Sequence, residues 1–332
     1  MAGISDWSAR LTRYDRTMEE MTNPKQGDAE CAPGRLTVGS GPQAVRVPIK
    51  YEGAAPHEAR RAMIIVHGRR RDAVTYARLA MDAFGRLMPD LLIAAPQFLA
   101  VQDLIGGGGE QLAYWGERDW MEGGLAAGPL PIAAFAVLDA LCAHLADRTR
   151  FPLIDDIVLA GHSAGGQLVH RYAILSPVAD DVRFIVANPS SYVWFGPGPG
   201  PGPGSGPEPG PGPFRWKYAL AGRPAYGAML DDAAIEARYV GRDMLYLLGA
   251  RDCDPAHPML DRSAAAMAQG PHRLARGRAY QAHLAERHGA ALRHRWVEVP
   301  DVGHDPAGIL SATVAQEAIW PAYLNLADHA RP

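Results

Sequence analysis

Residues 156–172 read DIVLAGHSAGGQLVHRY, and this stretch decides the fold of the chain. Its apolar run at 157–160 is typical of a strand that is covered on both faces, and residues 167–172 continue as a helical pattern. The turn between them, GHSAG at 161–165, carries Ser163 at its centre. Because side chains in place of its two glycines would collide with adjacent backbone, the stretch predicts a tight strand-to-helix turn with a projecting serine hydroxyl.

The same alternation of strands and helices continues along most of the chain. Strand-like segments lie at 35–38, 45–51, 62–66, 91–94, 156–160, 182–187, 244–248 and 296–299. Helical patterns lie between and after them, at 75–87, 129–147, 167–175, 272–288 and 313–326. This order predicts an α/β fold, in which a mostly parallel central sheet carries helices on both faces. The first two strands, joined by a short turn-rich connection, predict an antiparallel hairpin at the edge of that sheet.

Length and composition favour one large globular domain. The chain has 332 residues, of which 48% are hydrophobic and 21% are charged, and its formal net charge is -3. Such a chain can bury a substantial core, and its charge suggests neither nucleic acid nor an anionic membrane as a partner. We therefore expect a single domain at residues 35–332, preceded by an N-terminal extension at residues 1–34.

Several classes of protein are disfavoured by what the sequence lacks. Charged residues interrupt the first 22 residues, so a signal peptide is not expected, and no segment approaches the roughly 20 consecutive apolar residues of a membrane span. The three cysteines, Cys31, Cys142 and Cys253, are widely spaced. We therefore expect no disulfide framework and a reducing, cytoplasmic location. No His, Cys and Glu residues have the spacing of metal ligands, and we expect neither a metal nor a cofactor.

Two stretches interrupt the alternation of strands and helices. Residues 196–213 are an almost pure alternation of Gly and Pro, whose period of two excludes collagen and predicts an insert without a packing role. Residues 103–128 form a long loop, and its four glycines at 106–109 lack the Lys and Ser/Thr of a phosphate-binding loop. This loop is rich in aromatic residues and is a candidate to overhang a substrate pocket. The candidate lining residues of that pocket are Trp115, Trp120, Asn188 and Tyr192.

His304 is the candidate base for Ser163. A serine hydroxyl is a poor nucleophile until a base takes its proton, so a histidine must come within hydrogen-bond reach. Most of the twelve histidines fall within predicted helices or polar turns, whereas His304 lies in a loop directly after the strand predicted at 296–299. Catalytic groups of an open α/β sheet gather at such strand ends. The alternative is a histidine of an ordinary surface loop.

The third group should be a carboxylate that holds the imidazole in the correct tautomer. After the strand predicted at 244–248, the residues GARDCDP at 249–255 again place acidic side chains at a strand end. Asp252 is the first choice for this role, and Asp254 is the alternative. Both belong to the same turn, and whichever is not catalytic is expected to cap that turn.

An oxyanion hole needs two backbone N–H groups. The strand predicted at 62–66 runs into HGRRRD at 67–72, so the N–H groups of Arg69 and Ala164 are the predicted pair. His67 is then expected to be structural. The arginine run that follows it is either a solvated surface or an attractor for an acidic group of the substrate.

These residues resemble the α/β-hydrolase superfamily over roughly residues 45–325. The resemblance is carried by the HG turn at 67–68, the GHSAG turn at 161–165, the GARD turn at 249–252 and GH at 303–304, which follow the order Ser, Asp, His. It implies the α/β-hydrolase fold, a triad of Ser163, Asp252 and His304, and an acyl-enzyme intermediate on the serine.

The resemblance also implies a class of substrate. The chain is similar, more loosely, to esterases and to polyhydroxybutyrate-depolymerase-like proteins, so a carboxylic-ester hydrolase with a small-molecule substrate is the expected function. Thioesterase, amidase or polyester depolymerase activity by the same triad are alternatives, because fold and triad do not set the substrate. A non-catalytic binding protein of the same fold is a further alternative, and the oligomeric state stays open.

Overall fold

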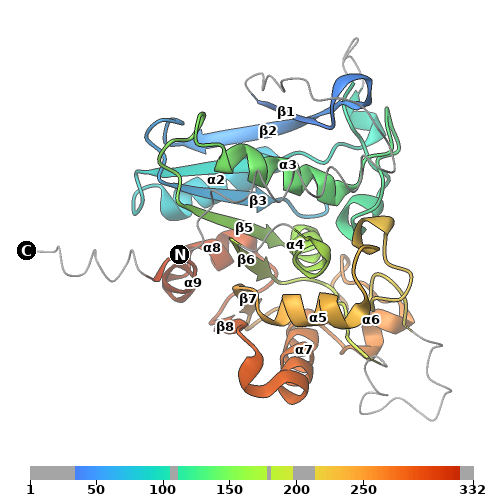
Figure 1. Cartoon of the computed structure of the whole chain (residues 1–332). Helices are drawn as coiled ribbons and strands as arrows, with labels where there is room; N and C mark the ends of the chain where they lie inside the picture. The colour runs from blue at the N-terminus through green and yellow to red at the C-terminus, as the bar shows by residue number, and fades with distance from the viewer. Residues whose placement is uncertain (1–33, 105–110, 178–180, 197–213, 322–332) are drawn as a thin grey trace, which may run out of the picture.

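The computed structural model describes residues 34–104, 111–177, 181–196 and 214–321, and an eight-stranded sheet runs through its centre (Figure 1). The strands lie in the order β1-β2-β4-β3-β5-β6-β7-β8. Their bounds are Arg35–Val38 (β1), Val45–Gly53 (β2), Arg61–Val66 (β3), Leu91–Pro96 (β4), Asp156–His162 (β5), Val182–Ala187 (β6), Met244–Gly249 (β7) and Arg295–Val299 (β8). Each of the eight predicted strands overlaps one of these, so the predicted sheet is confirmed.

The sheet is mostly parallel, as the order of strands and helices predicts. The ladder from β4 through β3, β5, β6 and β7 to β8 is parallel throughout. At its edge, β1 and β2 form the expected antiparallel hairpin, and β2 joins the sheet by pairing antiparallel with β4. Because the strands are parallel, the carboxyl ends of β3, β5, β7 and β8 meet at one edge, where the predicted functional residues lie.

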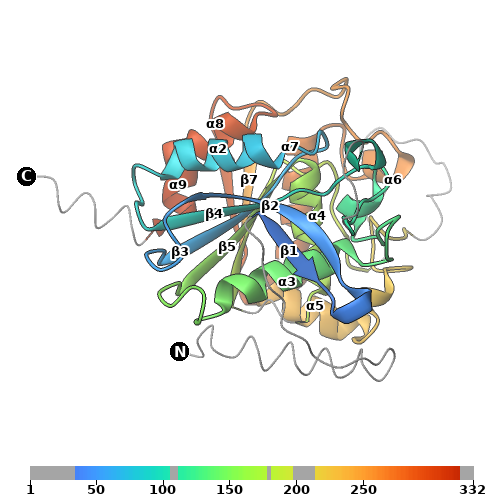
Figure 2. The same ribbon diagram turned by 90° about the horizontal axis from the view of Figure 1, so that it is seen from above.

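Helices cover both faces of the sheet (Figure 2). On one face lie α2 (Ala73–Phe84), α8 (Pro306–Ser311) and α9 (Thr313–Ile319), and on the other lie α3 (Ala134–Ala146), α4 (Ala164–Leu175), α5 (Asp232–Val240) and α7 (Arg273–His288). Neighbouring residues of β3 show the division, because Ile64 packs into the core with α3 and α4, whereas Ile65 packs into the core with α2. Both side chains are almost fully buried, which explains the continuous apolar character of the central strands.

Three short helices do not appear among the sequence predictions. α5, α6 (Ala264–Ala268) and α8 have between five and nine residues, too few to show a clear helical period. The predicted helix at 129–147 begins only at Ala134, because Ala133 before it forms an isolated antiparallel bridge with Leu125. Short 3-10 helices lie in the connections, at Gly41–Gln43, Val101–Leu104, Asp119–Glu122, Ala225–Gly227 and Gly289–Ala291.

Some predictions concern residues outside the described ranges. These are nearly all of the N-terminal extension at 1–34, the glycine run at 106–109, the Gly/Pro stretch after residue 196 and the end of the helix predicted at 313–326. Within the described ranges, no helix has both the length and the apolar character needed to cross a membrane.

Candidate active site

Ser163 occupies a strained turn between β5 and α4. Its backbone has φ 57° and ψ -114°, a conformation that residues other than glycine rarely adopt. The turn is tight on both sides: a Cβ at position 161 would lie 2.4 Å from the carbonyl carbon of Gly165, and a Cβ at position 165 would lie 2.2 Å from the carbonyl oxygen of Val66. Two close backbone approaches therefore explain why glycines flank this serine.

Three side chains from distant parts of the sequence meet at this turn. The Nε2 atom of His304 lies 2.9 Å from the Oγ atom of Ser163, and its Nδ1 atom lies 2.7 Å from Oδ2 of Asp252. His304 stands in the loop between β8 and α8, and Asp252 follows the end of β7. With the ring proton on Nδ1, where it forms a hydrogen bond to Asp252, Nε2 is free to accept the serine proton.

The structure distinguishes between the two acidic residues of the turn after β7. Asp252 is buried and contacts His304, whereas Asp254 is exposed and its Oδ1 accepts a hydrogen bond from the backbone N–H of Ala256 at 2.8 Å. Asp254 therefore caps the turn, which is the structural role expected for the residue that is not catalytic.

The Asp252 carboxylate is held in its ionised form by its partners. Burial on its own raises the pKa of Asp252, but the hydrogen bond and charge of His304 and the guanidinium of Arg273 outweigh burial and lower that pKa below its ordinary value. Arg273 Nη1 donates to Oδ1 of Asp252 at 3.2 Å. A negative charge therefore faces the imidazole, where it can stabilise an imidazolium.

The turn after β3 passes beside the serine. A Cβ on Gly68 would lie 3.9 Å from the Cβ of Ser163 and 2.7 Å from the hydroxyl of Tyr76, so the turn passes where only glycine fits. His67 links this turn to the residues after β4. Its Nδ1 lies 2.9 Å from the carbonyl oxygen of Gly68, and its Nε2 accepts a hydrogen bond from the backbone N–H of Phe98 at 3.1 Å. Burial lowers the pKa of His67 to about 4, so this ring is neutral and structural, as expected.

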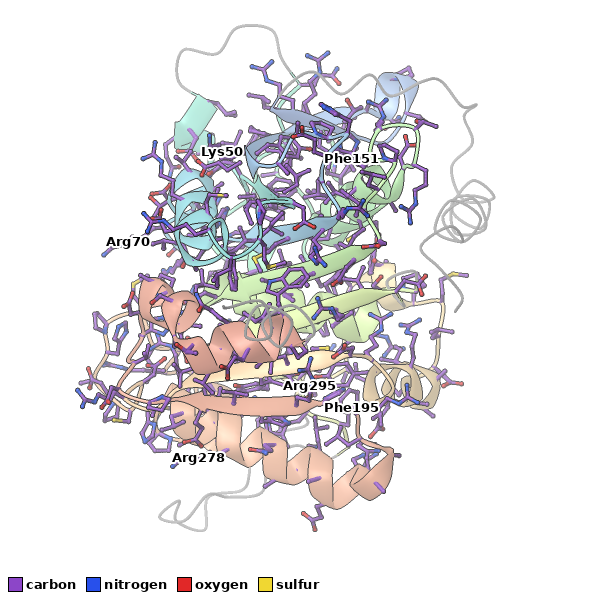
Figure 3. All side chains as sticks on the ribbon, turned by 90° about the vertical axis from the view of Figure 1, so that its left-hand side faces the viewer. Lys50, Arg70, Phe151, Phe195, Arg278 and Arg295 are labelled. Atoms are coloured by element: carbon purple, nitrogen blue, oxygen red, sulfur yellow. The ribbon has the colours of Figure 1, made fainter. Side chains whose placement is uncertain are left out.

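The three arginines of this turn have different surroundings. Arg71 donates to the backbone carbonyls of Leu99 and Trp115 and so ties the turn to the loop after β4. Arg69 forms an ion pair with Glu117. Arg70 is exposed and lies at the outer edge of the molecule (Figure 3). The run is therefore partly a structural anchor and partly a solvated surface.

The fold of this chain is also found in solved structures. The chain is similar to poly(aspartic acid) hydrolase-1 from Sphingomonas sp. KT-1, with a TM-score of 0.64 and 23% sequence identity over 87% of this chain and 100% of that chain. It is also similar to a poly(3-hydroxybutyrate) depolymerase from Bordetella parapertussis, with a TM-score of 0.57 and 24% identity over 83% of each chain. Both share its mostly parallel sheet with flanking helices. This chain has the α/β-hydrolase fold. No protein-family model matches the sequence, and no curated protein matches it significantly.

The four candidate pocket residues of this chain are packed in its interior. Trp115, Trp120, Asn188 and Tyr192 expose at most 1% of their surface, so a substrate has no side-chain surface to contact there. Trp120 stacks on Phe98 with ring centroids 5.2 Å apart, which places the aromatic loop in the core instead of over a pocket. Aromatic content signals burial as strongly as it signals ligand contact, and here burial explains it.

Asn188 and Tyr192 have packing roles of their own. The Oδ1 atom of Asn188 accepts from the N–H of Gly249 at 2.8 Å, and its Nδ2 donates to the carbonyl of Gly303 at 3.2 Å. It therefore joins the end of β7 to the loop that carries His304. Tyr192 stacks on Tyr280 of α7, with ring centroids 4.7 Å apart.

Several residues around His304 are not among the sequence predictions. The rings of His162 and His257 lie 4.7 Å and 5.1 Å from the His304 ring. Burial, with the positive charges of His304 and Arg273, lowers the pKa of His162 well below its ordinary value, so it stays neutral. His162 lies within the GHSAG turn and could have been found there. Arg273 stands 21 residues from its partner Asp252, and no local pattern marks it.

Proposed function

We propose that this α/β-hydrolase is a serine hydrolase that cleaves a carboxylic ester through an acyl-enzyme on Ser163. The observation that carries the proposal is the hydrogen-bonded row of Ser163, His304 and Asp252, with distances of 2.9 Å and 2.7 Å. A nucleophile, a base within reach of it, and a group that orients the base are the arrangement that activates a hydroxyl.

The reaction has two steps in which His304 moves a proton. Ser163 Oγ attacks the ester carbonyl while Nε2 of His304 accepts the hydroxyl proton, and Asp252 stabilises the imidazolium that forms. His304 then protonates the departing alcohol, leaving the acyl group on Ser163. In the second step a water attacks the acyl-enzyme, its proton passes to His304, and the acid leaves as the serine recovers its proton.

The developing oxyanion needs donors opposite His304, and the N–H groups of Ala164 and Arg69 are the proposed pair. Ala164 is the first residue of the 12-residue helix α4. Its N–H has no acceptor within the helix, and the partial positive charge of the helix end adds to its effect. Arg69 belongs to the turn that passes beside Ser163 at Gly68. Such donors act mainly on the transition state.

The bond that is cleaved is the second part of the proposal. Of the two structures compared above, one is a poly(3-hydroxybutyrate) depolymerase, which cleaves a polyester, and the other is a hydrolase of poly(aspartic acid), a polyamide. An ester is the preferred substrate because its alcohol leaves more easily than an amine from the same intermediate. Amide, thioester and polyester cleavage are the alternatives, since the same three side chains serve all of them.

Reaction with a fluorophosphonate probe tests the proposal, because such probes label serines that a working base has activated. We expect stoichiometric labelling of the wild-type protein at Ser163, located by mass spectrometry of the labelled peptide. The Ser163→Ala variant is the control and should not be labelled. An unlabelled, folded wild-type protein would instead support the alternative of a non-catalytic binding protein.

A substrate panel separates the classes of bond. We expect hydrolysis of p-nitrophenyl esters of graded acyl length, with slower or no release from the matching anilides. Turnover of poly(aspartic acid) or of an anilide at a rate above that of every ester would favour the amidase alternative. Soluble polyester fragments should be included, because a depolymerase would prefer them over monomeric esters.

A further inference from the structure

The carboxylate of Asp252 uses both of its oxygens. Oδ2 faces Nδ1 of His304 at 2.7 Å, and Oδ1 accepts from Nη1 of Arg273 at 3.2 Å. The side chains of Asp252 and Arg273 expose 3% and 1% of their surface, so water does not replace either partner. A buried carboxylate oxygen without a donor would be costly, and here an arginine supplies that donor.

Arg273 is itself held in place from several directions. It is the first residue of α7, and its Nε donates to Oγ of Ser190 at 2.9 Å. The next residue, Leu274, donates its backbone N–H to the carbonyl oxygen of Asp252 at 3.1 Å. The start of α7 is therefore attached both to the side chain and to the backbone of the acid turn.

A further contact leads from Arg273 to the rim of the site. Its Nη2 lies 3.4 Å from Nδ1 of His257, which also accepts from the backbone N–H of Met259 at 3.2 Å. An arginine only donates, so this ring nitrogen of His257 is an acceptor. One guanidinium thus reaches the acid, a neighbouring serine and the histidine that packs on His304.

We propose that Arg273 is a positioning residue for the acid of the triad, holding the Asp252 carboxylate ionised and in the orientation that His304 requires. The proposal rests on the proposed function, because it assigns a role within that reaction. Arg273 acts through Asp252 and does not touch the reacting atoms.

The charge of Arg273 gives the proposal a distinctive consequence. A guanidinium beside the carboxylate offsets part of the negative charge that His304 experiences, so it makes the imidazolium harder to form. Without it, His304 is protonated at a higher pH, and the base is lost from a larger part of the acidic range. A merely structural arginine would change stability without this effect.

The charged and titratable groups around this pair come from several elements. Asp252, Asp254 and His257 belong to the loop between β7 and α6, and His272 and Arg276 lie at the start of α7. The others are His162 at the end of β5, Tyr192 in the loop after β6 and His304 in the loop after β8. Burial lowers the pKa of His162, His257 and His272, with Arg273 contributing to the first two. These shifts favour the neutral form of the three rings, and Arg273 is the fixed positive charge that contacts Asp252.

The test compares pH profiles of ester hydrolysis for wild type and Arg273→Gln. We expect kcat to fall by about 10- to 100-fold with little change in KM, because a misplaced acid no longer orients His304 towards Ser163 but does not alter ester binding. The acid limb of the kcat/KM profile should move to higher pH, so that the loss of kcat/KM relative to wild type grows as the pH falls. Arg273→Lys keeps a positive charge and should return the acid limb towards its wild-type position.

Arg276→Gln is the matched control, since Arg276 lies one turn further along α7 and is also fully buried. It donates to the backbone carbonyls of Gly270, Ser190 and Asp261 instead of to a side chain of the triad. We expect it to lower thermal stability without moving the acid limb. If Arg273→Gln does not fold, Ser190→Ala removes one support of the guanidinium and should move the acid limb in the same direction.

Three outcomes would overturn the proposal. The first is a folded Arg273→Gln protein with the wild-type kcat and acid limb, and the second is an equal limb shift in Arg276→Gln. In both cases the wild-type enzyme is active and the proposed function stands. The third is a wild-type protein that neither hydrolyses esters nor reacts with a fluorophosphonate, in which case the proposed function fails and this proposal fails with it.

Discussion

Ser163 combines a strained backbone with a hydroxyl that lies within hydrogen-bond distance of His304. Its positive φ is held by backbone hydrogen bonds on both sides, from its own N–H to the carbonyl of Ala187 at 2.9 Å and from the N–H of Gln167 to its carbonyl at 3.0 Å. These bonds belong to β6 and α4, so the position of the hydroxyl is set by rigid elements. Strain of this kind persists only where the surrounding structure maintains it.

Replacing either Ser163 or His304 by Ala should abolish turnover. We expect kcat to fall by roughly 10⁴-fold or more for each, because the triad residues act as one unit. Thermal unfolding should stay within a few degrees of wild type, since neither side chain is part of the core. A fall below about tenfold in either variant, measured by ester hydrolysis, would contradict the assignment.

The choice between the two acids can be tested directly. Asp252→Asn replaces the charged acceptor of His304 and favours the wrong tautomer, so kcat should fall by about 10²- to 10⁴-fold. Asp254→Asn is the matched control at an exposed turn position and should change kcat by less than about twofold. Equal mild effects in both variants would show that the acid lies elsewhere.

At the scale of elements, the site depends on how closely β3, β5 and α4 approach. Gly161 and Gly165 face each other across the turn, and Gly165 also lies against the carbonyl oxygens of Val66 and His67. A third glycine, Gly166, lies where a Cβ would be 2.7 Å from the carbonyl oxygen of Ala187 in β6. Helix α4 therefore starts in direct backbone contact with three strands, which keeps the serine above the sheet.

Gly165→Ala tests that contact. The added Cβ would lie 2.2 Å from Val66 O and 2.6 Å from His67 O, and neither backbone atom can move without disturbing β3. We expect a loss of about 2–3 kcal/mol in the free energy of unfolding, with reduced kcat. Gly241→Ala is the control, because a Cβ there would meet nothing nearer than 3.6 Å and should change stability by less than about 0.5 kcal/mol. Chemical denaturation of the three proteins measures the difference.

At the scale of the whole molecule, buried neutral histidines are a common feature of the interior. Burial lowers the pKa of His67 and of His294 from 6.5 to about 4, and burial with nearby positive charge lowers the pKa of His170 well below 6.5. Each ring is fixed by hydrogen bonds, such as the one from the N–H of Val193 to Nε2 of His170 at 2.9 Å. The folded protein therefore resists protonation at several sites.

This feature predicts a loss of stability in mild acid. Between pH 6.5 and about 4 the unfolded chain binds protons at these histidines and the folded chain does not, so stability falls as the pH falls through that window. Each such histidine contributes a slope of roughly 1.4 kcal/mol per pH unit. Urea denaturation at a series of pH values measures the slope, and His294→Gln should reduce it. Equal stability at both ends of the window would contradict the prediction.

Carboxylates change the stability of the protein at a lower pH than the buried histidines do. The pKa of Asp252 is lowered in the folded protein, so its contribution is present above the pKa of the unfolded chain and is lost only as the pH falls through the folded value. A loss of stability that begins near pH 6 therefore comes from histidines, and a loss of stability that begins below about pH 4 comes from carboxylates. The two effects can be separated by the pH at which stability starts to fall.

The sheet, its edge hairpin and the position of Ser163 were predictable from local sequence, because they depend on neighbouring residues. An apolar strand, a glycine-flanked serine and a helical run are all contained in residues 156–172, and the structure forms β5, the turn and α4 from them. The place of His304 beside Ser163 was predictable for a related reason, since the carboxyl ends of parallel strands share one edge. The single domain at 35–332 stays a prediction.

Which side chains face one another depends on contacts that form only in the folded chain. Asp252 and Asp254 are equivalent in sequence, and the difference between them comes from contacts with His304, Arg273 and Leu274, which lie 20 or more residues away. The candidate pocket aromatics turned out to be core residues for the same reason. The direction of a side chain in a loop follows from what packs against it, and that is decided by long-range contacts that no local pattern records.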